Sequence, residues 1–126
     1  MRQTQGREQK FRKLTVWHKA MSVVSEVYEV TGKFPKDELY GLTSQLRRAA
    51  VSIAMNIAEG SGADSDAEFK RFLTLASKSV FEVMCGLEVA ANLTYLSREL
   101  TDRLLDHLEE LSRMLHGLVK KLKADS

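Results

Sequence analysis

The clearest helical pattern in the chain is LLDHLEELSRMLHGLVKKL, residues 104–122. Its leucines recur at steps of four and three residues, which places them on one side of an α-helix. A stripe this long and regular is typical of a helix that packs along its whole length against other helices. The stripe consists of Leu104, Leu108, Leu111, Leu115, Leu118 and Leu122.

Further apolar stripes with the same periodicity predict helices over residues 11–31, 42–60 and 65–93. Gly32 is expected to end the first of these in a left-handed conformation. Ser65 and Glu68 have the spacing of a capping box at the start of the helix over residues 65–93. The core stripe predicted for the first helix consists of Leu14, Trp17, Met21, Val24 and Tyr28.

Four long amphipathic helices with short connections favour an all-α fold, an antiparallel up-and-down four-helix bundle. The chain has 126 residues, of which 44% are hydrophobic and 29% charged, so a single domain is expected. We assign residues 1–10 to a flexible basic tail, residues 11–123 to the bundle and residues 124–126 to a frayed end. A single cysteine and the lack of a long apolar run predict a cytoplasmic protein with no disulfide and no membrane partner.

The net charge of +2 is unevenly distributed, because basic residues gather near both ends of the chain. An antiparallel bundle brings the start of the first helix and the end of the fourth to the same end, so both clusters can form one phosphate-binding patch. The alternative is a solvated tail with cations that offset the dipole of the last helix. The candidate nucleic-acid-binding residues are Arg2, Arg7, Lys10, Arg12, Lys13, Lys120, Lys121 and Lys123.

The sequence offers no pattern typical of catalysis. Di-iron bundles need Glu-x-x-His pairs, and metalloproteases need HExxH, and neither occurs here. Cys85 lies beside Met84 in a largely apolar helix, and we interpret it as a packing thiol. We therefore expect no catalytic residue, no metal, no cofactor and no small-molecule substrate.

A row of polar residues lies beside the apolar stripe of the second helix, and a matching row lies on the third. Serine and asparagine are mediocre helix formers that gain most where they have hydrogen-bond partners. We expect the rows to meet in a polar network, within the protomer or between subunits. A ligand site and plain exposure to solvent are the alternatives. The rows are Gln45, Arg48, Ser52, Asn56 and Glu59, and Glu68, Arg71, Lys78, Ser79 and Glu82.

Gly86 and Gly117 lie inside predicted helices, where glycine costs roughly 1 kcal/mol relative to alanine, so we expect close helix contacts at both. Phe81 and Met84 fall outside the core stripe of the third helix and are candidates for an exposed apolar interface. They support an alternative hypothesis, in which the chain is a protein-protein interaction module that binds no nucleic acid.

Five segments together resemble a known bacterial family: FRKLTVWHKA (residues 11–20), FPKDELYGL (34–42), QLRRAAVSI (45–53), NIAEG (56–60) and FxxFLxxA (69–76). Its members are four-helix-bundle proteins encoded in intervening sequences of 23S ribosomal RNA genes, also called S23 ribosomal proteins. The resemblance implies a homopentamer, similar to the accessory protein of diversity-generating retroelements, which binds its reverse transcriptase and nucleic acid. It implies RNA or a reverse-transcriptase-like protein as partner and supplies no active-site residue. The resulting hypothesis is a non-enzymatic oligomeric scaffold that contacts such a partner through its basic ends.

Overall fold

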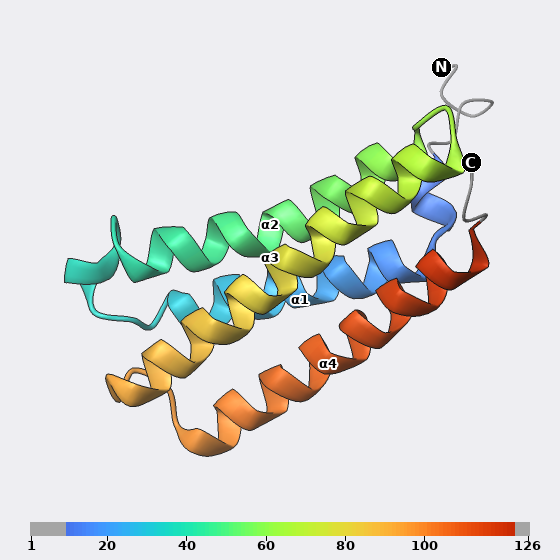
Figure 1. The fold of residues 1–126 in the computed structure, drawn as a ribbon. Coiled ribbons are helices and arrows are strands. Elements are labelled where there is room, and N and C mark those ends of the chain that lie inside the picture. Colours follow the sequence, from blue (N-terminus) through green and yellow to red (C-terminus); the bar gives the residue numbers. More distant parts are fainter. Residues whose placement is uncertain (1–9, 123–126) are drawn as a thin grey trace, which may run out of the picture.

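The computed structural model describes residues 10–122, and within this range it contains four α-helices, two short 3₁₀ helices and no strand. Successive α-helices run in opposite directions along one another (Figure 1). The chain is therefore an antiparallel up-and-down four-helix bundle, as predicted. Its elements are η2 (Lys10–Lys13), α1 (Thr15–Thr31), η3 (Lys36–Glu38), α2 (Leu42–Ser61), α3 (Asp66–Asn92) and α4 (Arg98–Lys121).

Serine side chains cap the first turns of α3 and α4. Ser65 Oγ accepts a hydrogen bond from the backbone N–H of Glu68 (3.1 Å), and Ser97 Oγ accepts one from the N–H of Leu100 (3.1 Å). These bonds satisfy backbone donors that a helix leaves free at its start. The Glu68 carboxylate binds the Arg71 guanidinium (2.9 and 3.1 Å) instead of returning to the backbone of Ser65. The serine half of the predicted capping box is thus present, and an ion pair replaces the other half.

The end of α1 differs from the prediction. Gly32 has φ −62°, which is right-handed and not the expected left-handed conformation. The backbone continues in tight turns, in which the N–H of Lys33 donates to the Val30 carbonyl (3.2 Å) and that of Phe34 to the Thr31 carbonyl (3.1 Å). Because these turns already return Phe34 to the core, the chain needs no left-handed residue here.

α1 carries two apolar stripes, and the core contains the one that was not predicted. Most members of the predicted stripe directly follow a core residue in sequence, so they lie about 100° round the helix from it. Met21 and Tyr28 of the predicted stripe remain 40% and 43% exposed. The core accepts the smaller side chains because they let α1 approach its neighbours closely, and the larger ones lie at the edge beside α2. The buried stripe consists of Val16, Ala20, Val23, Val27 and Val30.

α2 and α3 form the most extensive helix pair in the bundle and lie side by side (Figure 1). A Cβ atom added at Gly86 of α3 would lie 2.5 Å from Leu46 Cδ2 of α2. This confirms the close contact predicted at Gly86. The corresponding prediction for Gly117 is wrong, because no atom lies within 4 Å of a Cβ placed there. Gly117 lines an open groove beside the start of α1, and it does not take part in a close helix contact.

Glu38 links the α1–α2 connection to the α3–α4 turn, at the end of the bundle opposite η2. Its Oε1 accepts a hydrogen bond from the N–H of Leu42 at the start of α2 (3.1 Å), and its Oε2 accepts one from the Tyr95 hydroxyl (2.8 Å). Tyr95 belongs to the α3–α4 turn, and its ring centroid lies 5.4 Å from that of Phe34. The bonds from Leu42 and Tyr95 lower the pKa of Glu38, and the bond to Glu38 raises the pKa of Tyr95.

Alanine at the two internal glycines should have opposite effects. Gly86→Ala pushes its methyl group into the buried Leu46, and should lower the free energy of unfolding by about 1–2 kcal/mol despite a better helix propensity. Gly117→Ala meets open space and should raise it by about 0.5–1 kcal/mol. Urea unfolding of both variants measures the difference, and shifts of the same sign would contradict this account of the packing.

Glu38 should make the stability of the bundle sensitive to acid. Because its pKa is lower in the folded chain, its stabilisation is present above about pH 4.3, the usual glutamate pKa, and is lost as the pH falls through the lowered value. The stability difference between wild type and Glu38→Gln should therefore shrink as the pH falls. Urea titrations at a series of pH values measure it, with the exposed Glu109→Gln on α4 as control. A difference that stays constant with pH would contradict the prediction.

Candidate functional site

Three polar side chains form a hydrogen-bonded cluster where α2 and α3 pack together. Ser52 Oγ and Ser79 Oγ share a hydrogen bond of 2.9 Å. Asn56 Nδ2 donates to the Ser52 carbonyl oxygen (2.9 Å) and to Ser52 Oγ (3.1 Å). Ser79 is only 7% exposed, so its hydroxyl needs a protein partner in place of water. We call Ser52, Asn56 and Ser79 the polar seam.

The other members of the two predicted polar rows stay outside the polar seam. Arg48 donates to Ser44 Oγ on its own helix, and Arg71 binds Glu68 on α3. The pKa of Arg71 is raised mainly by its hydrogen bond to Glu68, and more weakly by the charges of Glu68 and Glu59. The rows therefore meet at their centre, and their ends are left at the surface. The exposed remainder consists of Gln45, Glu59, Lys78 and Glu82.

The described residues of the predicted basic patch lie at one end of the bundle, where η2 and the last turn of α4 are found (Figure 1). Lys13 and Lys121 line the same groove, which has a volume of about 380 Å³ and also includes Gly117. The basic end is the name we give to Lys10, Arg12, Lys13, Lys120 and Lys121, all of which are exposed. Three further predicted residues, Arg2, Arg7 and Lys123, lie outside the described residues.

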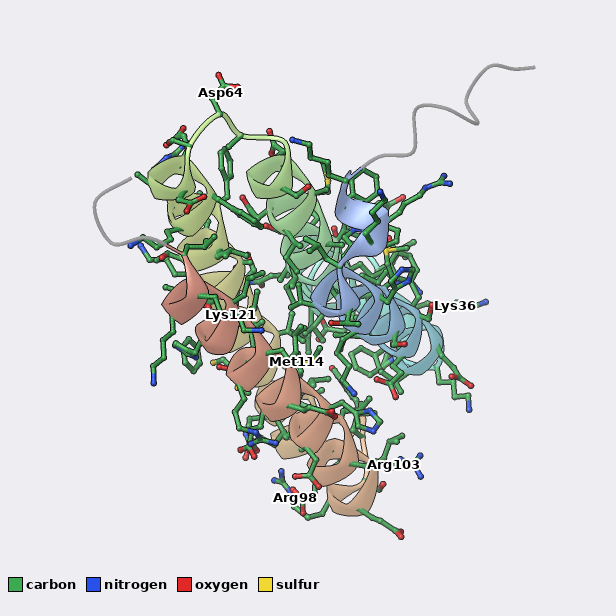
Figure 2. All side chains as sticks on the ribbon, turned by 90° about the vertical axis from the view of Figure 1, so that its right-hand side faces the viewer. Lys36, Asp64, Arg98, Arg103, Met114 and Lys121 are labelled. Carbon is green, nitrogen blue, oxygen red and sulfur yellow. The ribbon has the colours of Figure 1, made fainter. Side chains whose placement is uncertain are left out.

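Acidic residues are found at the same end of the molecule, on the α2–α3 turn and on α3, whereas the basic end belongs to η2 and α4. Asp64 projects from the turn between α2 and α3 (Figure 2), and the first turn of α3 contains Asp66 and Glu68. Between residues 10 and 122, neither Lys13 nor Lys121 forms an ion pair. Their ammonium groups are therefore available to an external anion on the α1–α4 side.

A largely apolar groove that sequence analysis did not anticipate runs along the outside of α1 and α2. Its main part has a volume of about 730 Å³, and a hollow of about 290 Å³ continues it and shares Val51 and Met55. Met55 is 58% exposed, which is unusual for an apolar side chain at the centre of a helix face. We call this feature the outer groove; it includes Trp17, Met21, Val24, Tyr28, Leu39, Tyr40, Arg47, Arg48, Val51 and Met55.

The sequence did contain a signal for the outer groove, in the stripe of Trp17, Met21, Val24 and Tyr28. The sequence alone predicts that stripe in the core, because a single helix with two apolar stripes can bury either of them. Only the packing of the other helices selects which stripe faces inward.

α3 presents an apolar line on its outer side. Phe81 is 58% exposed, and the exposed residues Cys85 and Val89 follow it at intervals of four, which places all three on one side of the helix. We call Phe81, Cys85 and Val89 the α3 ridge. Met84 was predicted to share this interface, but it is half-buried and packs against the core.

The histidines lie apart and have different partners. His18 Nε2 is hydrogen-bonded to the carbonyl oxygen of Arg12 (2.7 Å), and His107 Nδ1 lies 2.8 Å from a carboxylate oxygen of Glu26. In the part of the chain that the structure describes, no group of three histidine, cysteine or acidic side chains is placed to hold a metal ion. None of the helices between residues 10 and 122 combines the length and the hydropathy of a bilayer span.

A family model described as 23S rRNA-intervening sequence protein matches residues 12–117, which include all four helices except the last residues of α4. The chain belongs to this family. The match confirms the resemblance carried by the five sequence segments. It extends from η2 through the polar seam to Gly117 on α4, so the polar seam, the outer groove and the α3 ridge all lie within the matched region.

Among solved structures, this 23S rRNA-intervening sequence protein is similar to a protein of unknown function from the S23 ribosomal protein family of Bacteroides thetaiotaomicron. The two are 24% identical, with a TM-score of 0.75, and the match covers 84% of this chain and 99% of the other. This similarity supports the fold. None of the curated proteins compared matches the chain.

Removing the two serine hydroxyls of the polar seam one at a time should lower the free energy of unfolding by unequal amounts. Ser52→Ala leaves the buried Ser79 hydroxyl without its partner and should lower the free energy of unfolding by about 1–2 kcal/mol. Ser79→Ala leaves Ser52 bonded to Asn56 and should cost less than about 1 kcal/mol. The double variant should cost less than the sum of the two, since it removes both partners together. Strict additivity in urea unfolding would refute the coupling.

Proposed function

We propose that this 23S rRNA-intervening sequence protein is a non-enzymatic, cytoplasmic, oligomeric scaffold that contacts RNA through its basic end. The observation that carries the proposal is the groove shared by Lys13 and Lys121. Two cations from opposite ends of the described chain line one surface there, and neither has an acidic partner among residues 10–122. Phosphate contacts from lysine and arginine provide most of the sequence-independent affinity for nucleic acid.

The distribution of charge at this end favours one orientation of the RNA. A phosphate backbone is attracted to Lys13 and Lys121 on the α1–α4 side and repelled by Asp64 on the α2–α3 turn. The lysines are held by the helices themselves, since η2 leads into α1 and Lys121 is the last residue of α4. We therefore expect the RNA to cross the mouth of the Lys13–Lys121 groove.

A single copy has few such contacts, because the net charge is only +2. Several copies joined together would present several basic ends to one RNA, and the second contact then forms at a high effective concentration. The proposal therefore includes a homo-oligomer, and the family resemblance favours a pentamer. The assembly would raise affinity without requiring a strongly basic subunit.

The proposal predicts that removing the two groove lysines reduces the salt dependence of RNA binding. In Lys13→Ala/Lys121→Ala, the plot of log K against log salt concentration should become shallower by about 1.4–1.8 per bound copy, since each phosphate contact contributes about 0.7–0.9. Fluorescence anisotropy with a single-stranded RNA and an RNA hairpin measures this slope over a range of salt concentrations.

The matched control is Lys33→Ala/Lys36→Ala, which removes the same charge from the other end of the bundle, where η3 connects α1 to α2. Its slope should equal that of the wild type. Equal slopes for the two double variants would reject the basic end as the RNA surface, and an absence of wild-type binding at low salt would reject RNA as the partner. Circular dichroism verifies that both variants remain helical.

The alternative function is a protein-protein interaction module that binds no nucleic acid. The outer groove favours it, because apolar side chains that gather at the surface are a common feature of protein interfaces. A nucleic-acid-processing protein, such as one similar to a reverse transcriptase, is the partner that the family resemblance suggests. Assembly without RNA binding at any salt concentration would select this alternative.

A further inference from the structure

The exposed side of α2 differs in composition from that of α4. All exposed residues of α4 are charged except His116 and Gly117, which is the usual composition of a helix that faces water. The exposed residues of α2 include Met55, and the half-buried Val51 and Ala58 lie beside it. The outer side of α2 is therefore more apolar than the surface of a helix that is always in contact with water.

The outer groove offers space for an apolar side chain that projects from a helix. It is a hollow between two helices with Val51 and Met55 along it. On the α3 ridge Phe81 is 58% exposed, whereas Cys85 and Val89 border a small hollow of about 190 Å³ against α2. A helix side fits such a hollow in the way that an amphipathic helix occupies an apolar groove. Two outer grooves facing each other would leave unfilled space between them.

One pair of opposite charges lies beside the two surfaces, together with Glu59 in the outer groove and Lys78 one turn before Glu82 on α3. Arg48 lies in the outer groove and is bonded only to the neutral Ser44 among residues 10–122. Glu82 follows Phe81 on α3, is exposed, and has no basic partner in the described chain. The polar network expected from sequence, within the protomer or between subunits, included both residues, and within the described chain Arg48 and Glu82 are not paired with each other. A second copy can bring them together.

We propose that the outer groove of one copy receives the α3 ridge of a second copy, with Arg48 of the groove paired to Glu82 of the incoming helix. This inference rests on the oligomeric part of the proposed function and identifies the surfaces that make the oligomer. Because the two surfaces are different, each copy uses its groove on one neighbour and its ridge on another. Such head-to-tail contacts generate a closed ring when the rotation between copies closes.

Mixing two assembly-deficient variants tests the pairing of unlike surfaces. Met55→Asp spoils the groove and leaves the ridge intact, whereas Phe81→Asp spoils the ridge and leaves the groove intact. Both residues are largely exposed, so both variants should fold. By sedimentation velocity the wild type should be a multi-subunit assembly and each variant a monomer, and an equimolar mixture should form a one-to-one heterodimer and nothing larger.

The other outcomes of this experiment overturn specific statements. If Met55→Asp is monomeric while Phe81→Asp still assembles, grooves pair with grooves and the ridge has no role. If the wild type assembles and both variants do so too, or if the mixture stays monomeric, the surface assignment is wrong while an oligomeric scaffold stands. If the wild type is a monomer at all concentrations, the oligomeric part of the proposed function fails, and this inference fails with it.

A charge exchange tests the Arg48–Glu82 pair. Arg48→Glu and Glu82→Arg should each raise the dissociation constant of the assembly by about tenfold or more. The variant carrying both substitutions should recover most of that lost affinity, because a close charge pair across an interface is strongly coupled. Glu109→Arg on the outside of α4 is the control and should leave assembly unchanged. A double variant that assembles no better than either single one would refute the pair.

Discussion

The close approach of α2 and α3 constrains the rest of the bundle. A Cβ atom at Gly60 would lie 2.9 Å from Phe72 Cβ, and one at Gly86 would lie 2.5 Å from Leu46 Cδ2, so small residues are required at both ends of this helix pair. At both ends a glycine makes room for leucine or phenylalanine side chains of the other helix, and between these ends the small side chains of Ser52 and Ser79 face each other. The polar seam is therefore a consequence of close packing, and its hydrogen bonds satisfy groups that the packing removes from water.

This packing also explains why α1 turns its valine stripe inward. α2 and α3 already fill much of the core with Ile53, Ile57, Leu73 and Leu87, so the remaining space suits small β-branched residues better than a tryptophan or a tyrosine. The larger stripe is left at the α1–α2 edge, where Arg47 stacks 4.5 Å over the Tyr28 ring and holds it in place. The outer groove is thus produced by the same competition for core space that stabilises the bundle.

The helices could be predicted from the sequence because periodicity and caps are local, and α4 follows its leucine pattern closely. Contacts that depend on two segments far apart in the chain could not be predicted in this way. Gly86 and Gly117 look alike in sequence, yet only Gly86 faces a neighbouring helix. In the same way, the chemistry of the polar row on α2 was visible, but sequence did not show that only Ser52 would bond to Ser79, with Asn56 bonded in turn to Ser52. The direction of each helix face is set by its neighbours.

The two proposals support each other through symmetry. In a closed ring with a single rotation axis, every copy has the same orientation relative to that axis, so all basic ends would lie at the same height along it. Head-to-tail pairing of the outer groove with the α3 ridge would leave α4, with its charged exposed residues, without a partner. Each Lys13–Lys121 groove, which lies between the start of α1 and the end of α4, would then stay open. A ring of this kind could present repeated phosphate contacts to one RNA although each subunit is nearly neutral.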